Sequence, residues 1–363
     1  MGPNMKNWIT NNQINWDILQ QYDWLQNMQH CEQDKEWHTE GNVYVHTQMV
    51  VSELQQLTEY QSLTSEEKDI LLLSALLHDV AKPQCTFEEN GRIVSPKHAK
   101  IGEKVARDLL WDMDFEQREQ VCALVRLHGL PLWSLEKGNP NRSVIASSLR
   151  VKNEWIYLLS KADVLGRICT DQAELLERLE FFKELCLENQ CFTQVKVFFN
   201  EHSKFKYFQN DDVYPQHIFD DTKFEIVMLS GIAGSGKDTY CASFNLPTVS
   251  LDDIRTKLKI KPDDKSGQGK VIQEAYAQAK MYAGKKQSFV WNSTNLTQEL
   301  RSKLINLLAP YNPKFKIIYI ETSRKEVMKH RSESIPKSVL EKMYRILDMP
   351  LSEEAHEVLY VRR

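Results

Sequence analysis

FEIVMLSGIAGSGKDT, residues 224–239, is the stretch that decides the fold of the second half of the chain. Its apolar run predicts a buried strand, its glycines allow the backbone to approach a phosphate, and the residues after Lys237 can open a helix. Backbone N–H groups and the positive end of a helix dipole would converge on an anion, which Lys237 would reach as a point charge. The stretch therefore predicts a phosphate-binding loop.

The spacing of this loop predicts a nucleoside triphosphate, ATP or GTP with Mg²⁺, as its cofactor. One residue departs from the usual pattern, because Asp238 stands where a Ser or Thr normally holds the magnesium ion, and Thr239 comes one place later. A simple chain-reversing turn is the alternative, but the glycines and the lysine all fall at the offsets of a phosphate loop. The expected cofactor-binding residues are Gly231, Ala233, Gly234, Ser235, Gly236, Lys237, Asp238 and Thr239.

Short apolar segments alternate with amphipathic helical patterns throughout residues 222–363, as a parallel α/β sheet requires. We expect strands at residues 225–229, 248–251, 288–291 and 315–320, helices between them, and two terminal helices within 336–361. Active-site residues of such sheets follow the carboxyl ends of the strands. Asp252 and Arg255 follow the second expected strand, and Asn295 follows the third.

Asp252 and Arg255 meet the two needs of a phosphoryl-transfer site. A carboxylate must accept the proton of the acceptor hydroxyl, and a cation must lie beside the acceptor's own phosphate. The alternative is that Asp252 and Asp253 only cap the next helix, which Asp often does.

Residues 1–200 are dense in helical patterning and predict an all-α domain. Thr64 and Glu67 form a capping box, so a buried helix should begin there and end near Pro83. Residues 201–221 contain turn-forming residues without a helical period, and we expect them to be a linker between the two domains.

His78 and Asp79 lie at the end of this apolar helix, where both would be desolvated unless something compensates them. A metal ion would compensate them, and imidazole and carboxylate ligands suit one or two divalent ions such as Mn, Fe, Co, Ni, Cu or Zn. One ion would be held by His46, His78, Asp79 and Asp163, and a second by Asp79, His98 and His128, with Asp79 bridging.

With this doublet, residues 15–195 resemble the HD phosphohydrolase superfamily, and in particular its members that act on nucleotides and RNA ends. The segments ALLHDVAK (75–82) and ADVLGR (162–167) carry the likeness. The resemblance implies that Asp79 is catalytic, that Lys82 and Arg167 bind phosphate, and that His38 contacts the substrate.

Residues 222–363 resemble the polynucleotide 5′-kinases of bacteriophages and bacteria, through GSGK, DDIR and TNL segments in that order. The resemblance implies that Asp252 is the general base, that Arg255 binds the acceptor's 3′-phosphate and that Lys237 clamps the donor phosphates. Arg331 would be the lid arginine, although the family often has more than one, and Asn295 and Arg301 would serve the acceptor side.

Taken whole, the chain resembles bacterial fusions of an HD phosphohydrolase with a polynucleotide kinase, which heal broken RNA ends. The resemblance implies RNA or DNA ends as substrates: the kinase half phosphorylates a 5′-hydroxyl, and the HD half removes a 2′,3′-cyclic phosphate or a 2′- or 3′-phosphate. A separate RNA ligase is the implied partner. Two alternatives stay open: a metabolite or nucleoside kinase fused to an HD nucleotidase, and a regulator that senses nucleotides without turnover.

The composition indicates which partners and which cellular compartment to expect for the protein. Lys plus Arg number 46 and Asp plus Glu 50, so no overall positive charge points to nucleic acid. The seven cysteines form no C-x-x-C pair, which predicts reduced thiols in a cytoplasmic protein. No apolar segment is long enough for a membrane span. Neither charge nor pattern predicts the oligomeric state.

Overall fold

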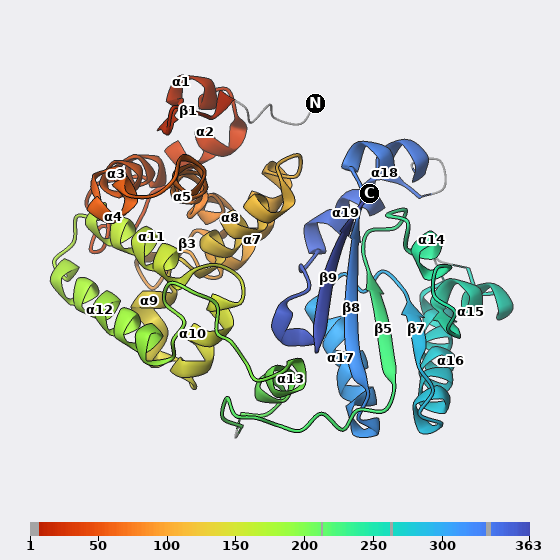
Figure 1. Cartoon of the computed structure of the whole chain (residues 1–363). Helices are drawn as coiled ribbons and strands as arrows, with labels where there is room; N and C mark the ends of the chain where they lie inside the picture. The colour runs from red at the N-terminus through yellow and green to blue at the C-terminus, as the bar shows by residue number, and fades with distance from the viewer. Residues whose placement is uncertain (1–6, 212, 262–263, 332–334) are drawn as a thin grey trace. The chain divides into compact units, whose positions relative to one another are not determined.

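The computed structural model describes residues 7–211, 213–261, 264–331 and 335–363. The chain divides into two compact units, Met1–Lys196 and Val197–Arg363 (Figure 1). None of the described helices is long and apolar enough to cross a membrane. All seven cysteines are free thiols, and Cys169 is the one that is not buried.

Helices build the first unit, as the sequence predicts, and four of them, α3, α5, α8 and α11, pack together at its centre. Its helices are α1 (Trp16–Leu19), α2 (Asp23–Gln29), α3 (Val43–Gln56), α4 (Thr58–Gln61), α5 (Ser65–Leu77), α6 (Lys82–Cys85), α7 (His98–Leu109), α8 (Phe115–Leu127), α9 (Leu130–Trp133), η2 (Ser134–Glu136), α10 (Pro140–Ser148), α11 (Asn153–Leu165) and α12 (Gln172–Glu188). Two short antiparallel hairpins complete it: β1 (Ile9–Thr10) with β2 (Gln13–Ile14), and β3 (Phe87–Glu89) with β4 (Arg92–Val94).

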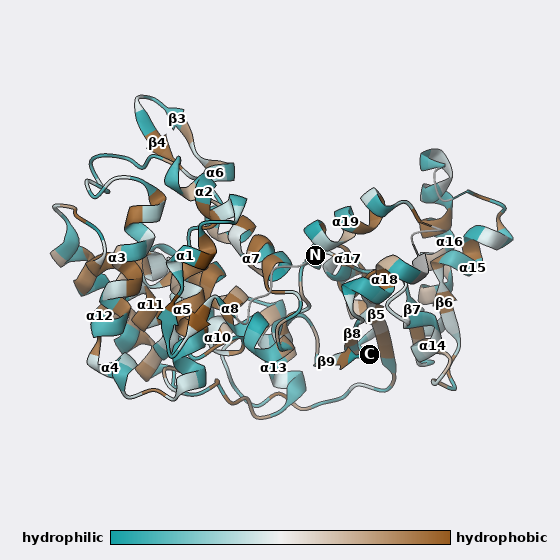
Figure 2. Ribbon diagram, turned by 90° about the horizontal axis from the view of Figure 1, so that it is seen from above, coloured by the Kyte–Doolittle hydropathy of each residue, from teal (hydrophilic) through white to brown (hydrophobic). Residues whose placement is uncertain are grey.

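Helix α5 is the centre of this unit, and its hydrophobic residues are brown in Figure 2. The predicted capping box is confirmed: the Thr64 hydroxyl accepts from the Glu67 N–H while the Glu67 carboxylate accepts from the Thr64 N–H. Every residue from Ile70 to Leu77 is buried, so the helix is held from all sides. The helix therefore delivers His78 and Asp79, which follow it directly, into the interior.

A parallel five-stranded sheet forms the second unit, with strand order β6-β7-β5-β8-β9. The strands are β5 (Glu225–Ser230), β6 (Thr248–Ser250), β7 (Phe289–Asn292), β8 (Lys314–Glu321) and β9 (Glu357–Arg362). Its helices are α13 (Glu201–Gln209), α14 (Lys237–Cys241), α15 (Leu251–Lys257), α16 (Lys265–Gly284), α17 (Gln298–Leu308), η3 (Ala309–Tyr311), α18 (Arg324–Arg331), α19 (Lys337–Ile346) and η4 (Ser352–Glu354).

Strand β5 is the middle strand, and its residues alternate between two apolar cores. Ile226 and Met228 pack in the core that includes α16 and α17, while Val227 and Leu229 pack in the core that includes Cys241 of α14. This alternation follows from the period of two in a strand. It buries β5 on both faces and presents its carboxyl end, with the glycine loop, beside the ends of β7 and β8.

Two element predictions are wrong. The segment predicted to be helical as far as Val361 is helical over α19 and the short η4, and its last part is the strand β9, which pairs in parallel with β8. The predicted linker contains helix α13, which begins where the Asn200 side chain accepts from the Ser203 N–H. Phe205 of α13 is buried and packs on Phe315 of β8, so this helix belongs to the second unit.

Candidate functional site

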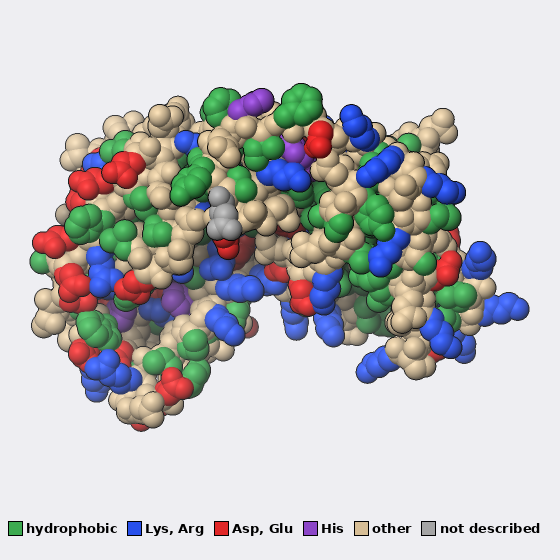
Figure 3. All heavy atoms as spheres, turned by 90° about the horizontal axis from the view of Figure 1, so that it is seen from below, with side chains coloured by type: hydrophobic (Ala, Val, Ile, Leu, Met, Phe, Trp, Pro, Cys, Tyr) green, Lys and Arg blue, Asp and Glu red, His purple; other side chains and the backbone are tan. Residues whose placement is uncertain are grey.

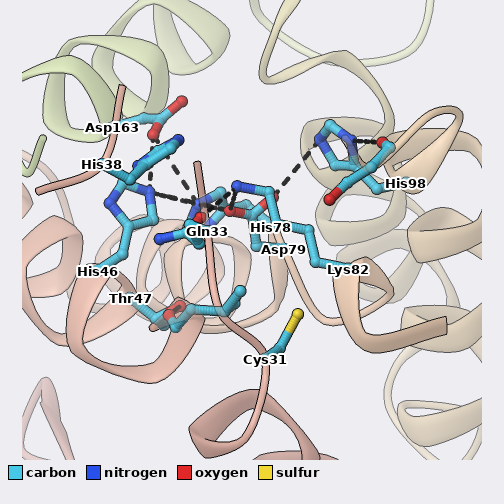
Figure 4. Close-up of polar contacts among 12 residues, drawn as sticks. Cys31, Gln33, His38, His46, Thr47, His78, Asp79, Lys82, His98 and Asp163 are labelled. Carbon is cyan, nitrogen blue, oxygen red and sulfur yellow. Dashed lines mark hydrogen bonds and ion pairs between the residues drawn. The ribbon is translucent and has the colours of Figure 1, made fainter. Parts of the chain in front are cut away.

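A cluster of histidines and carboxylates lies at the centre of the first unit (Figure 4). His46 comes from near the start of α3, His98 from the first turn of α7, and Asp163 from the last turn of α11. His78 caps α5 and is followed by Asp79, and His128 caps α8 in the same way. Helix packing thus brings together all six predicted metal ligands from five places in the sequence.

Backbone carbonyls set the orientation of three of these imidazoles. Each Nδ1 lies 2.8–2.9 Å from the carbonyl oxygen three residues earlier: His78 from Ala75, His98 from Ser95, and His128 from Val125. Because a carbonyl only accepts, Nδ1 must carry the proton and Nε2 keeps its lone pair. The structure therefore turns a metal-binding nitrogen of each ring toward the cluster.

The lone pairs of these rings face one another. The Nε2 atoms of His46 and His78 are 3.4 Å apart, and those of His98 and His128 are also 3.4 Å apart. Asp79 Oδ1 is buried and has no hydrogen-bond partner among the described residues. Facing acceptor atoms and an orphaned carboxylate oxygen need a positive centre between them, so this donor set fits divalent metal ions.

Asp79 lies between two groups of ligand atoms. It shares one group with His46 and His78 and the other with His98 and His128, as the predicted bridging role requires. Its Oδ2 is 3.2 Å from His78 Nε2, and its Oδ1 is 3.5 Å from His98 Nε2. Asp163 approaches the first group, with Oδ1 3.0 Å from His46 Nε2. The two groups of ligand atoms could therefore bind either one divalent ion or two.

The pKa shifts of His98, His128 and Asp79 suit cation binding, whereas the pKa of His46 is raised. Burial would lower the pKa of His46, but hydrogen bonds to Asp163 and Glu40 outweigh this effect. Burial, together with the nearby His78 and His98, lowers the pKa of His128 to about 3, and burial also lowers the pKa of His98. Burial alone would raise the pKa of Asp79, but the charges of Lys82 and His78 hold it well below its usual range. Neutral imidazoles and ionised carboxylates are the forms that bind a metal.

Glu40 is a site residue that the sequence reasoning missed. Its Oε1 accepts from His38 Nδ1 at 2.7 Å and from His46 Nδ1 at 3.0 Å, and Oε2 accepts from the Ile168 N–H at 3.0 Å. The bond to His46 gives that ring the same orientation that carbonyls give the others. The H-x-E spacing of His38 and Glu40 was the available signal.

The predicted phosphate ligands lie beside the cluster. Lys82 donates from Nζ to Asp79 Oδ2 at 2.7 Å and to Gln33 Oε1 at 2.6 Å. Arg167 forms a two-point ion pair with Asp163. Lys82, Arg167 and His38 also line a cavity of about 610 Å³. Figure 3 shows histidine and basic side chains together in a hollow of the first unit.

In the second unit, the glycine loop has the backbone of a phosphate-binding loop. Gly231, Gly234 and Gly236 have φ of +149°, +88° and +93°, which L side chains rarely adopt. A Cβ on Gly231 would lie 2.5 Å from the Ile320 carbonyl oxygen. Lys237 lies across the loop, with Nζ donating to the carbonyls of Gly231 and Ile232.

Polar groups around this loop fit a bound phosphate and its metal ion. Ser235 Oγ is buried and lacks a hydrogen-bond partner in the part of the chain that the structure describes. Asp238 is exposed, and its Oδ1 accepts from Asn292 Nδ2 at 2.8 Å, so its carboxylate lies at the end of β7. Thr239 is also exposed, while Ala233 and Gly234 are partly exposed.

Asp252 and Arg255 lie together on α15, directly after β6. They form an ion pair, and Arg255 Nε also donates to Gln268. The Asp252 side chain is 85% exposed and open to an acceptor. Ser250, not either aspartate, is the cap of α15, since its hydroxyl accepts from the Asp253 N–H. The helix-cap alternative therefore does not account for Asp252.

Asn295 and Arg301 are placed differently from the expectation. Asn295 is buried, donates to the Leu229 carbonyl at 2.6 Å and accepts from Trp291 Nε1, so its amide holds the strand ends together. Arg301 is fully buried in a two-point ion pair with Glu354. Both are structural residues, because their polar groups are used within the unit. Arg331 ends α18, and its side chain lies outside the described residues.

Comparison with known protein families matches one domain model to residues of each unit. The model of the HD domain matches residues 43–154, and that of the AAA domain matches residues 226–348. The chain carries an HD domain followed by a P-loop kinase-like domain. Five of the six cluster residues lie within the residues that the HD model matches, Asp163 follows them, and the glycine loop lies within the residues that the AAA model matches. No curated protein matches the chain.

Among solved structures, the second unit is similar to a candidate kinase from Chloroflexus aurantiacus J-10-fl, with 17% identity and a TM-score of 0.33, over 39% of this chain and 86% of that one. It is also similar to a sugar kinase from Janibacter sp. HTCC2649, with 17% identity and a TM-score of 0.29, over 39% and 85%. Neither likeness bears on the substrate of this chain.

Proposed function

We propose that this protein heals broken RNA ends, with the kinase-like domain phosphorylating a 5′-hydroxyl and the HD domain removing a 2′,3′-cyclic phosphate or a 2′- or 3′-phosphate. The observation that carries the proposal is that one chain holds two separately built candidate sites for phosphate. One is a histidine-carboxylate cluster, and the other is a glycine loop in a sheet that also carries a paired carboxylate and arginine after strand β6. Cleavage of one RNA strand produces both kinds of end, which is a chemical reason to join the two activities.

In the HD domain, His46, His78, Asp79 and Asp163 would hold one divalent ion, and Asp79, His98 and His128 a second. Such ions supply Lewis-acid activation of water and of the phosphate group. Lys82 lies 2.7 Å from Asp79 and opens onto the cavity, so its ammonium would meet a phosphate oxygen there. Arg167 would hold Asp163 in place through its two-point pair.

In the kinase-like domain, the loop amides and Lys237 would hold the triphosphate of ATP or GTP. Asp252 would accept the proton of the 5′-hydroxyl, and Arg255, once released from Asp252, would bind the acceptor's 3′-phosphate. Asp238 would supply a carboxylate oxygen to Mg²⁺ where related loops have a hydroxyl. Arg331 would contribute a lid charge. An RNA ligase acting on the healed ends is the partner that this chemistry requires.

The test uses one RNA that carries a 5′-hydroxyl and a 2′,3′-cyclic phosphate. With labelled ATP and Mg²⁺ we expect label on the 5′ end, and with Mn²⁺ or another transition metal we expect release of the 3′-terminal phosphate. If a mononucleoside or sugar accepts phosphate and the RNA does not, the protein is a small-molecule kinase. If neither ATP nor any phosphate ester is turned over, the regulatory alternative holds.

A further inference from the structure

The lining of the cavity beside the histidine cluster includes two kinds of residue. The polar wall, as we call the first group, consists of His38, Lys82, His98 and Arg167 from the candidate phosphate site. The apolar wall consists of large apolar side chains: Trp37, Ile93, Trp133 and Leu175. A phosphate alone would need only the polar wall, and at about 610 Å³ the cavity has the size of a site for a whole small molecule.

Within the apolar wall, Trp133 is the residue whose side chain is held by a defined contact. It ends α9, which begins two residues after His128, so its position is tied to the cluster. The Arg178 guanidinium lies over its ring at 5.1 Å from the centroid, and Arg178 is itself held by the Leu132 carbonyl and by Glu174. Arg178 therefore covers one face of the indole, yet Trp133 as a whole is 48% exposed. This is a fixed aromatic platform.

Gln33 gives an independent sign of a ligand in the same cavity. It is only 5% exposed, and its Oε1 accepts from Lys82 at 2.6 Å, which fixes the orientation of the amide. Its Nε2 is buried and has no hydrogen-bond partner anywhere in the described ranges. A buried amide donor without a partner costs free energy unless something occupies the site. An oxygen of a bound phosphate ester is the acceptor that this position would suit.

We propose that the cavity binds a nucleoside phosphate, with the nucleobase stacked on the open face of Trp133 and the Gln33 amide donating to the phosphate. Every base has a π face, so stacking selects a nucleotide without selecting its sequence. A sugar phosphate would use the polar wall and leave the tryptophan platform without a role. The proposal rests on the proposed phosphoesterase function and adds to it a binding position for the terminal base.

The test compares two RNA substrates that differ only at the terminal 3′-phosphorylated residue, which either carries its base or is a stable abasic analogue. In the full-length wild type we expect the base to lower KM by roughly 5- to 150-fold, the range of one stacked base. Trp133→Ala should remove this preference, so that the two substrates agree within a factor of about 2. Trp133→Phe should keep part of it. Gln33→Leu should raise KM for both substrates alike, because both carry the phosphate.

Phe181→Ala, at an aromatic residue of the same unit that is 51% exposed on α12, is the matched control and should keep the full preference. The proposal is overturned if the wild type shows no preference, or if Trp133→Ala retains it. If neither substrate is hydrolysed with any metal, the proposed function fails. Calorimetric binding of a nucleoside 3′-monophosphate against ribose phosphate then decides the base site: tighter nucleotide binding that Trp133→Ala abolishes supports it, and equal binding refutes it.

Discussion

Glu40 orients two histidines at once, and this makes it the most informative single residue of the first unit. Burial alone would raise its pKa, but hydrogen bonds from His38, His46 and the Ile168 amide together lower it well below its usual range. An ionised Glu40 can accept from both imidazoles, which points His46 Nε2 at Asp163 and Asp79. Carboxylates that orient a metal-binding histidine in this way raise the affinity of the site for its ion.

Replacing Glu40 by glutamine should weaken metal binding, because the amide nitrogen of the new side chain would meet an N–H where a carboxylate oxygen accepted one. We expect a loss of about 10- to 100-fold in affinity, measured by chelator competition on the full chain. Glu88→Gln, at an exposed glutamate of β3, is the matched control. Equal affinity in Glu40→Gln and the wild type would show that Glu40 does not position His46.

Residue types and their order were enough to predict the histidine cluster, but not the direction of individual side chains. Asn295 follows a strand end as expected, yet its positive φ of 42° turns the amide back onto Leu229. Gln33 and Trp133 belong to no motif, and only the fold brings them to one cavity. Such contacts are set by tertiary packing, which a single sequence does not contain.

At the level of elements, the histidine cluster depends on how closely α11 approaches α3. Gly166 ends α11, and a Cβ there would lie 2.8 Å from the Val50 amide nitrogen and 2.9 Å from Val50 Cγ2. The absence of a side chain at Gly166 therefore lets α11 carry Asp163 to His46 of α3.

Gly166→Ala should force the two helices apart. We expect it to lower the free energy of unfolding of the first unit by about 1–3 kcal/mol, as overpacking of a core does, and to weaken metal binding as well. Urea unfolding followed by tryptophan fluorescence measures the first effect. Gly138→Ala is the control, because a Cβ there would have no neighbour within 4 Å. If both variants unfold like the wild type, the close approach is not required.

Helix α13 is held to the sheet of the second unit through two buried histidines. His356 Nδ1 accepts from the Phe315 N–H at 3.0 Å, so its Nε2 carries the proton and lies 3.0 Å from His202 Nδ1. Burial and the neighbouring His202 lower the pKa of His356 to about 3. A proton added to Nδ1 would displace the Phe315 bond, so the folded unit keeps this ring neutral.

Acid should therefore destabilise the second unit well before its carboxylates titrate. Below the ordinary histidine pKa of about 6.5 the unfolded chain binds a proton at His356 that the folded chain binds only near 3. Stability is thus lost as the pH falls through this window, by about 2 kcal/mol at pH 5. This loss of stability is measured by unfolding the wild type and His356→Gln at pH 7.5 and at pH 5.0. The free energy of unfolding should fall less in the variant than in the wild type. Equal losses would exclude His356 as the cause.

The elements that the sequence predicted best were those with a local signal. The capping box of α5 and the glycine spacing after β5 each settle a boundary within a few residues. Strand β9 was missed, because Glu357–Arg362 is short and its strand identity comes from pairing with β8. Helix α13 was missed because its turn-rich surroundings hid an apolar face that is visible only against Phe315.

At the scale of the whole molecule, the proposed function requires two chemistries that do not share residues. The histidine cluster and its cavity are built entirely within Met1–Lys196, and the glycine loop with Asp252 and Arg255 entirely within Val197–Arg363. Each unit has its own buried core. Loss of one site should therefore leave the other working, whatever the order in which the ends are processed.

The most direct measurement is to offer the RNA with 5′-hydroxyl and 2′,3′-cyclic phosphate ends to Asp79→Ala and Lys237→Ala in parallel with the wild type. Asp79→Ala should lose removal of the 3′-terminal phosphate, by at least about 100-fold, since it takes a bridging ligand from the cluster, and should keep 5′ phosphorylation. Lys237→Ala should do the reverse. If either substitution abolishes both reactions while the protein stays folded, the assignment of two independent sites is contradicted.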